Sequence, residues 1–165
     1  QIRSSAASDV YKRQDIEIYG ALDDLWLNKD TDEIVVLDYK ATSTKNLEDY
    51  TTSQKHYHVG YRRQLDFYAY LLKLNDFKVH DTGYWLICNA TDGEQKTFNK
   101  KVNFKTTLLS YKLNTDYIED ILVDLKACLN SDKYPSSGQD CDNCRWYNEK
   151  KKLGDAIRSN QNAKE

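Results

Sequence analysis

Two aspartates and one lysine have the types and the spacing needed to cleave a phosphodiester. Asp38 and Lys40 lie two residues apart at the end of the hydrophobic run EIVVLDYK, and Asp23 precedes them by the length of a hairpin. Residues two apart in a strand point to the same face. If the chain turns near residues 28–33, Asp23 comes level with Asp38, and two carboxylates meet beside one ammonium group.

Carboxylates held close together either raise a pKa or recruit a divalent cation. Mg²⁺ takes one or two carboxylates and leaves its other positions for water and phosphate. Mg²⁺ or Mn²⁺ would lower the pKa of a water and polarise a phosphoryl oxygen, while Lys40 orients that water or offsets charge in the transition state. The alternative is a salt bridge between Asp38 and Lys40 that only stabilises a hairpin end.

The periodicity of the chain predicts the elements that position these residues. Residues 15–28 alternate as in a strand, with Gly20 at a bulge or a close backbone approach. Four consecutive apolar residues, 34–37, predict a strand buried on both faces. Residues 42–53 are polar and predict a loop beside the strand end. Apolar positions at helical spacing predict a helix over about 57–74.

The second half predicts another hairpin and another helix. Strand-forming residues fill 82–91 before the turn signal Asp92-Gly93, and residues 97–104 are the expected partner strand. Residues 116–129 have apolar side chains at helical intervals. Together these elements predict an α/β fold with a central mixed β-sheet flanked by helices.

Composition predicts a globular domain. Hydrophobic residues make up 39% of the 165 residues and charged residues 30%, and no apolar run approaches the roughly 20 residues of a membrane helix. The formal net charge of -2 requires that any nucleic-acid contact be local. Four cysteines and the lack of a signal-peptide pattern predict a cytoplasmic location.

Three segments are expected along the chain. Residues 1–14 lack periodicity and start without Met, which predicts a non-native or disordered leader on a fragment without its natural N-terminus. Residues 15–156 are expected to form the domain. The polar residues 157–165 are expected to form a frayed tail.

Three short motifs occur in a characteristic order. They are G-x-x-D at residues 20–23, D-x-K at 38–40 and Q-x-x-x-Y at 64–68. The set resembles the PD-(D/E)xK nuclease superfamily, specifically its RecB-like branch, over about residues 15–146. The resemblance implies a restriction-endonuclease-like core, hydrolysis of phosphodiester bonds in DNA, and a setting of DNA repair or recombination.

The resemblance also implies roles for individual residues. On a helix, positions 64 and 68 share one face and can both point toward the strand ends. The family's upstream helix, which often completes the site, has no counterpart here, so a missing N-terminal segment or partner domain is expected and the fragment could be inactive. The implied metal ligands are Asp23, Asp38 and the Tyr39 carbonyl, and the implied catalytic residues are Asp23, Asp38, Lys40, Gln64 and Tyr68.

Other charged residues near the motifs have two interpretations. Asp24 is the rival of Asp23, but it points to the opposite face of a regular strand. Four basic residues either contact phosphates, without reading sequence, or form a solvated face. They are Lys45, Lys55, Arg62 and Arg63.

Cys141 and Cys144 have the spacing of half a metal site. Some RecB-like nucleases hold an iron-sulfur cluster with one upstream cysteine and three near the C-terminus. Here no upstream cysteine precedes the motifs and no third cysteine follows Cys144. We favour an unmetallated remnant over an iron-sulfur cluster or zinc.

Two functions from other classes compete with a nuclease. The first is a catalytically inactive nucleic-acid-binding module on the same fold, and metal-dependent cleavage separates it from the enzyme. The second is a structural protein with a fortuitous hairpin, which would bind no divalent ion. The sequence leaves open endonuclease or exonuclease action, DNA or RNA as substrate, and the oligomeric state.

Overall fold

A computed structural model of the chain describes residues 2–3, 16–91, 100–138 and 141–162. The chain divides into two units, residues 1–126 and residues 127–165, and each is described by itself. The first unit contains the four-stranded β-sheet and the three motifs at residues 20–23, 38–40 and 64–68. In the second unit, the helix α5 spans Asp142–Asn162.

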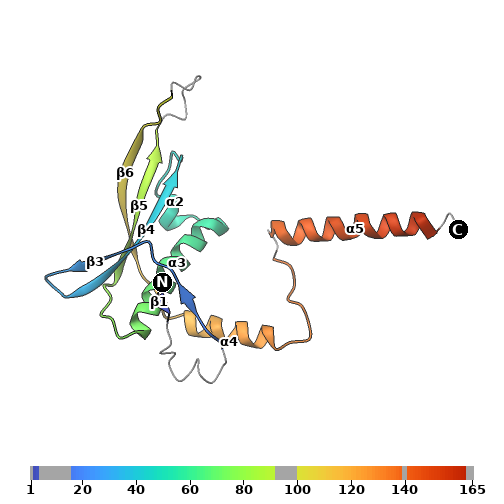
Figure 1. Cartoon of the computed structure of the whole chain (residues 1–165), viewed down its shortest axis with the longest axis horizontal. Helices are drawn as coiled ribbons and strands as arrows, with labels where there is room; N and C mark the ends of the chain where they lie inside the picture. The colour runs from blue at the N-terminus through green and yellow to red at the C-terminus, as the bar shows by residue number, and fades with distance from the viewer. Residues whose placement is uncertain (1, 4–15, 92–99, 139–140, 163–165) are drawn as a thin grey trace. The chain divides into compact units, whose positions relative to one another are not determined.

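The first unit is built on a four-stranded mixed sheet with the order β3-β4-β5-β6 (Figure 1). Its outer pairings are antiparallel and its central pairing, β4 with β5, is parallel. The predicted mixed sheet and its first hairpin are thus confirmed. The strands are β3 (Asp24–Asn28), β4 (Glu33–Thr42), β5 (Thr82–Ala90) and β6 (Phe104–Lys112).

The helices of this unit connect or follow the strands. The long helix α3 (His56–Leu74) lies in the crossover from β4 to β5, as a parallel pair requires. It confirms the helix expected at residues 57–74. The short helix α2 (Asp49–Thr52) precedes it, and α4 (Ile118–Leu129) begins after β6. Over the described ranges, no helix is long and apolar enough to cross a membrane.

One face of the sheet packs against α3. The face carries Val36, Trp85 and Ile87, which are fully buried against Leu65 and Leu72 of the helix. Val35 and Leu37, on the opposite face of β4, are also buried. The run of apolar residues in β4 is therefore buried on both faces, as predicted, and the α3 side of the sheet is the core.

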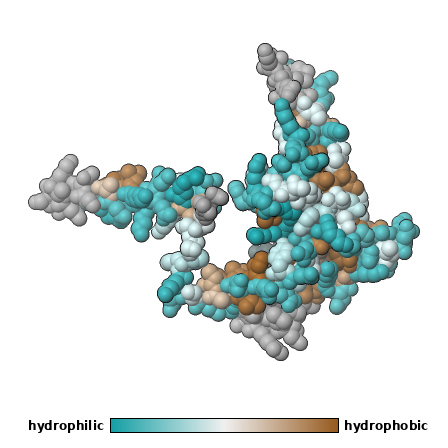
Figure 2. All heavy atoms as spheres, turned by 180° about the vertical axis from the view of Figure 1, so that it is seen from behind, coloured by the Kyte–Doolittle hydropathy of each residue, from teal (hydrophilic) through white to brown (hydrophobic). Residues whose placement is uncertain are grey.

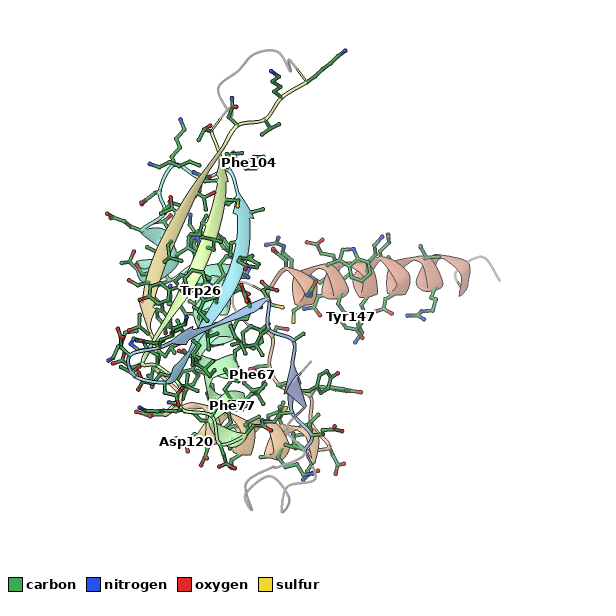
Figure 3. The ribbon with its side chains drawn as sticks, turned by 60° about the vertical axis from the view of Figure 1, so that its left-hand side comes forward. Trp26, Phe67, Phe77, Phe104, Asp120 and Tyr147 are labelled. Carbon is green, nitrogen blue, oxygen red and sulfur yellow. The ribbon has the colours of Figure 1, made fainter. Side chains whose placement is uncertain are left out.

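A second apolar cluster joins α3 to α4. Ile118 and Leu122 of α4 pack with Tyr70 and Leu71 of α3 and with Ile18. Other apolar side chains of α4 stay exposed, and Figure 2 shows apolar atoms on the molecular surface over this helix. Figure 3 shows Phe67 on α3, and Trp26 on the edge strand β3.

Gly20 marks the close approach that its place in the sequence predicted. It ends the short strand β2 (Tyr19–Gly20), which pairs with β1 (Ile2–Arg3). A Cβ at this position would lie 3.1 Å from the Tyr68 ring and 3.1 Å from Leu71 Cδ1. That spacing is closer than ordinary van der Waals contact, so glycine lets the chain pass directly over α3.

Three sequence-based expectations are corrected. The single strand expected over residues 15–28 is instead two shorter strands, Tyr19–Gly20 and Asp24–Asn28, because the chain bends at residues 21–23 after passing over α3. The partner of β5 is Phe104–Lys112 rather than residues 97–104, because the last residue of β5, Ala90, pairs with Phe104. The expected loop at residues 42–53 contains α2, whose Tyr50 is buried in the core.

The structure describes only part of the leader and tail segments that the sequence predicts. Most of the expected leader, residues 1–14, lies outside the described residues, as does the turn signal Asp92-Gly93. Helix α5 continues to Asn162, so much of the expected tail at 157–165 is helical.

Asp66 is a buried carboxylate that ties α3 to the start of α4. Its Oδ1 accepts a hydrogen bond from the Asn114 backbone N–H at 2.8 Å, and its Oδ2 accepts from the hydroxyls of Tyr117 at 2.9 Å and Tyr111 at 3.2 Å. Burial raises the pKa of Asp66, and these three donors lower it in part. Burial and the Asp66 charge raise the pKa of Tyr111 to about 12 and also raise that of Tyr117.

Tyr117→Phe is expected to lower the free energy of unfolding by about 1 kcal/mol near neutral pH, because Asp66 loses a donor. The phenol pKa values are raised by folding, so the folded chain holds protons that the unfolded chain releases. The contribution of these phenols to the free energy of unfolding is therefore fully present below about pH 10, and it decreases as the pH rises toward 12. Urea unfolding across this range should show the difference between wild type and variant shrinking. A constant difference would contradict the assignment.

Candidate active site

Asp38 is a buried carboxylate on the core face of β4. It is 1% exposed, in register with Trp85 of β5. None of the described residues donates a hydrogen bond to its Oδ1. Its Oδ2 lies 2.5 Å from the Lys40 ammonium in an ion pair. A buried carboxylate with an unpaired oxygen is costly unless a further cation or donor reaches it.

Lys40 is held on three sides. Besides the ion pair with Asp38, its Nζ donates a hydrogen bond to Gln64 Oε1 at 3.0 Å. The same Nζ lies 4.7 Å from the centroid of the Tyr61 ring, in a cation–π contact. The Lys40 side chain remains 16% exposed. Its ammonium is thus fixed in place while still reachable from solvent.

The structure brings Gln64 and Tyr68 to this lysine. Gln64 Nε2 lies 2.8 Å from the Tyr68 hydroxyl, and its Oε1 accepts from Lys40. The two residues are one helical turn apart on the same face of α3, as expected. Tyr68 is also buried in the core, where its ring lies beside Gly20. It therefore belongs both to the apolar stripe of α3 and to the polar chain that ends on Lys40.

Asp23, rather than Asp24, approaches Asp38. Asp23 lies in the bend before β3, and its Oδ2 accepts a hydrogen bond from the Tyr39 backbone N–H at 2.9 Å. Asp24 is turned away: its Oδ1 accepts from the Leu25 N–H, and its Oδ2 accepts from the Tyr39 hydroxyl. The Tyr39 hydroxyl and the neighbouring Leu25 N–H lower the pKa of Asp24.

The electrostatics of Asp38 reflect this arrangement. Burial raises its pKa most, the Lys40 ammonium lowers it, and the Asp23 carboxylate raises it again. Two carboxylates thus act on each other beside one fixed cation. An additional cation between them would relieve both the desolvation of Asp38 and the repulsion from Asp23.

The residues present fit a hard divalent cation. Within the described ranges, no three histidine, cysteine, aspartate or glutamate side chains gather as a metal site. Mg²⁺ does not require three, because one or two carboxylates with water and phosphate complete its coordination. The oxygens of Asp23 and Asp38 are a suitable donor set, since no donor in the described part of the chain occupies Asp38 Oδ1.

The four basic residues differ in what they contact. The Arg62 guanidinium donates to the carbonyls of Tyr50 at 2.9 Å and Ser53 at 2.8 Å, so it caps the end of α2. Arg63 is exposed on α3. Lys55 is exposed at the start of the same helix, and Lys45 is exposed in the segment before α2.

Cys141 and Cys144 lie in the second unit at the start of α5. The Cys144 backbone N–H points to Cys141 Sγ at 3.4 Å. The Cys144 side chain, together with backbone N–H groups, lowers the pKa of the Cys141 thiol. All four cysteines are free thiols. The two cysteines are not joined by a third sulfur ligand among the described residues.

Tyr61 is a further neighbour of the site. From the sequence it is one of the apolar positions that predict the helix and, with Arg62 and Arg63, a candidate for phosphate contact; its contact with Lys40 was not predicted. Its ring stacks on Tyr50 at 5.5 Å and carries the Lys40 ammonium on its face. Its place in the sequence offers a signal, because it lies three residues before Gln64 and so on the same helix face.

Tyr61→Leu is expected to lower kcat for phosphodiester cleavage about tenfold with little change in KM, because Lys40 loses the ring that holds its ammonium. Tyr61→Phe keeps the ring and should restore most of kcat. Steady-state kinetics on both variants measure the effect. Tyr57→Leu is the matched control, since Tyr57 is exposed and contacts Tyr61 edge-on. Equal kcat in the Leu and Phe variants would contradict this role.

The fold and the site define a restriction-endonuclease-like α/β protein with an acidic residue and a lysine on one central strand. A family model described as the PD-(D/E)XK nuclease superfamily matches residues 3–148. The chain therefore belongs to this superfamily, as its motifs predicted, and has a nuclease-type function. The searches of curated proteins and of solved structures gave no match.

Proposed function

We propose that this chain is a divalent-metal-dependent nuclease that hydrolyses phosphodiester bonds in DNA, with Asp23, Asp38 and Lys40 at its centre. The proposal rests above all on Asp38: a carboxylate that is 1% exposed, paired with Lys40, and left with one oxygen to which none of the described residues donates a hydrogen bond. A purely structural salt bridge would gain from satisfying that oxygen with a donor. Coordination of a cation by this oxygen would explain why no described residue donates a hydrogen bond to it.

The ligands of the metal would be Asp23, Asp38 and the Tyr39 carbonyl. The N–H and C=O groups of one strand residue point to the same side of the strand. The Tyr39 N–H donates a hydrogen bond to Asp23, so this contact supports the proposal that the Tyr39 carbonyl also points toward Asp23. β4 pairs with β3 only as far as Leu37, so no β3 residue pairs with Tyr39. Mg²⁺ or Mn²⁺ bound there would supply Lewis-acid catalysis and a water of lowered pKa.

The other residues of the site would position the reacting groups and stabilise the transition state. Lys40 would orient the attacking water or stabilise negative charge that develops on the phosphate. Gln64 would hold Lys40 in place through their hydrogen bond, and Tyr68 would hold Gln64. The polar chain from Tyr68 to Lys40 gives the ammonium a fixed direction before the substrate binds.

Contacts with the DNA backbone would come from exposed cations near the site. Arg63 lies on α3, Lys55 directly precedes this helix, and Lys45 precedes α2. They would position the strand without reading its sequence. Arg62 instead supports the fold, because its guanidinium already caps α2. A RecB-like enzyme of DNA repair or recombination, in the cytoplasm, fits this proposal.

The deciding experiment is cleavage of single-stranded and double-stranded DNA by the full chain, with Mg²⁺, with Mn²⁺ and with a chelator. Cleavage that requires the metal and is lost in Asp38→Ala would support the proposal. Metal-independent cleavage, or cleavage retained in Asp38→Ala, would overturn the site. Binding of DNA without any cleavage would favour an inactive nucleic-acid-binding module.

A further inference from the structure

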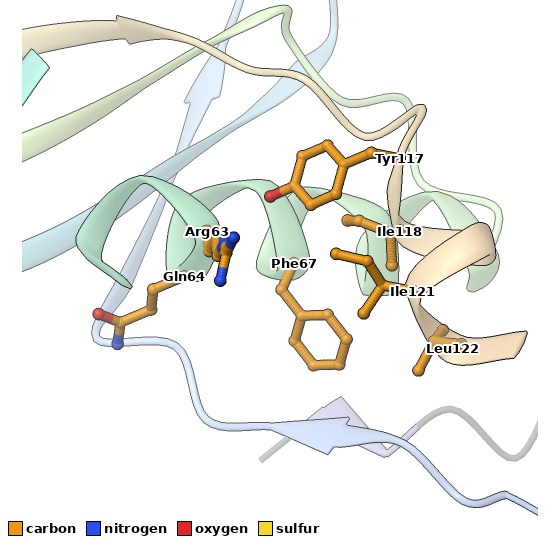
Figure 4. Close-up of a pocket in the computed structure, with 7 residues that line it drawn as sticks. All are labelled: Arg63, Gln64, Phe67, Tyr117, Ile118, Ile121 and Leu122. Carbon is orange, nitrogen blue, oxygen red and sulfur yellow. The ribbon is translucent and has the colours of Figure 1, made fainter. Parts of the chain in front are cut away.

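A cavity of about 340 Å³ opens between α3 and the start of α4. Helix α3 contributes Arg63, Gln64 and Phe67 to its lining (Figure 4). Tyr117 and three aliphatic side chains of α4, among them Ile121, form the other wall. The lining is therefore mostly apolar and aromatic, with one cation and one amide, which is the usual make-up of a small-molecule site of this size.

Gln64 belongs to this cavity and to the candidate active site at the same time. Its Oε1 accepts the hydrogen bond from Lys40 at 3.0 Å. A group bound in the cavity would therefore lie one side chain away from the lysine. For a substrate that is a nucleotide chain, this places the cavity beside the scissile phosphodiester.

The inner wall of the cavity is fixed before any ligand binds. The Tyr117 hydroxyl donates to Asp66 at 2.9 Å, which holds the ring in place. Ile118 and Leu122 are buried in the cluster that joins α4 to α3. The outer rim is open, because Ile121 is 45% exposed and Arg63 is exposed. A preformed wall with an open rim binds a flat ring with little ordering cost.

We propose that this cavity receives the unpaired nucleobase of a nucleotide next to the cleaved phosphodiester, and that the enzyme acts on single-stranded nucleic acid. The inference rests on the proposed function and specifies its substrate. Phe67 and Tyr117 offer faces on which any base can stack. Arg63 at the rim can contact the adjacent phosphate. A paired base is turned into the duplex and cannot enter, so the strand must be single or locally opened.

Binding of two oligomers with equal charge tests the inference directly. A fluorescent deoxythymidine octamer is compared with an octamer of abasic residues, both in chelator so that no cleavage occurs. The deoxythymidine octamer is expected to bind about tenfold or more tightly, since stacking of a base commonly contributes that much. Equal binding of the two oligomers would overturn the inference, because it would show that the bases add nothing to the affinity.

Variants locate the effect in the cavity. Ile121→Glu places a charge on the rim at an exposed position, and Val123→Glu, equally exposed on α4 but outside the lining, is its matched control. Phe67→Ala removes a stacking face, and Phe77→Ala, an exposed phenylalanine after α3 (Figure 3), is its control. The cavity variants should abolish the preference for the octamer with bases and the controls should keep it. The reverse result would overturn the inference.

The same oligomers separate this inference from the proposed function. If the wild-type chain prefers bases but cleaves nothing with Mg²⁺ or Mn²⁺, the cavity assignment stands and the nuclease proposal fails. If it cleaves but shows no base preference in chelator, the nuclease stands and the cavity assignment fails. A cleavage preference for single-stranded over double-stranded DNA, lost in Ile121→Glu but not in Val123→Glu, supports both.

Discussion

Asp38→Asn is expected to lower the rate of metal-dependent cleavage by at least about a thousandfold while leaving the melting temperature unchanged or higher. The rate falls because the amide removes a charged oxygen ligand from the site. Stability does not fall because the variant removes a desolvated charge whose Oδ1 has no donor among the described residues. Lys40 keeps its hydrogen bond to Gln64 and its access to solvent. Initial rates with Mg²⁺ and thermal unfolding measure both effects.

The matched control for this substitution is Asp24→Asn. Asp24 lies next to Asp23 in the sequence but is bound to the Tyr39 hydroxyl, away from Asp38. It should retain most of the activity. An active Asp38→Asn variant, or an Asp24→Asn variant that loses as much activity as Asp38→Asn, would reject the assignment of the two aspartates.

Lys40→Met is expected to abolish cleavage and also to lower the free energy of unfolding by about 3 kcal/mol. The second effect arises because Asp38, which is 1% exposed, would lose the cation 2.5 Å away and would have to remain ionised without it or take up a proton, and either is costly. Methionine retains most of the apolar length of lysine, so the loss is one of charge rather than of packing. Urea unfolding without divalent ions measures the loss of stability.

The double variant, Asp38→Asn with Lys40→Met, completes the cycle. It removes both charges and should regain most of the stability lost by Lys40→Met, while its activity stays absent. A double variant as unstable as the single one would mean that packing around Lys40, rather than its ion pair with Asp38, stabilises this part of the fold. Full activity in Lys40→Met would remove the lysine from the mechanism.

The parts of the fold that the sequence predicted are those with a strong apolar pattern. The helix at 57–74 has apolar side chains at helical spacing, and the four consecutive apolar residues 34–37 indicate a strand buried on both faces. Gly20 predicted a bulge or a close backbone approach, but the sequence did not show that the neighbour is the Tyr68 ring. The motif order 20–23, 38–40 and 64–68 predicted the superfamily that the family model confirms.

What the sequence did not predict depends on tertiary contacts. The strand Phe104–Lys112 was missed because the Asp92-Gly93 turn signal favoured a nearer partner for β5. Arg62 looked like a phosphate contact because nothing in the sequence shows that it caps α2. Asp66 passed unnoticed, since its three donors come from residues more than forty positions away. The roles of the site residues themselves stay predictions.

The strand that borders β4 changes along its length from β3 to β5, and this bears on when activity can arise during synthesis. β4 pairs with β3 over Glu33–Leu37 and with β5 over Leu37–Thr42, so Asp38 and Lys40 lie on the part that only β5 borders. A nascent chain that has emerged as far as Tyr68 carries the three motifs but not Trp85 and Ile87, the neighbours of Asp38 and Lys40 in the sheet. If the proposed site is correct, a chain truncated before β5 would be unable to cut nucleic acid. The motifs would form the site only after the crossover through α3 has added β5 to the sheet.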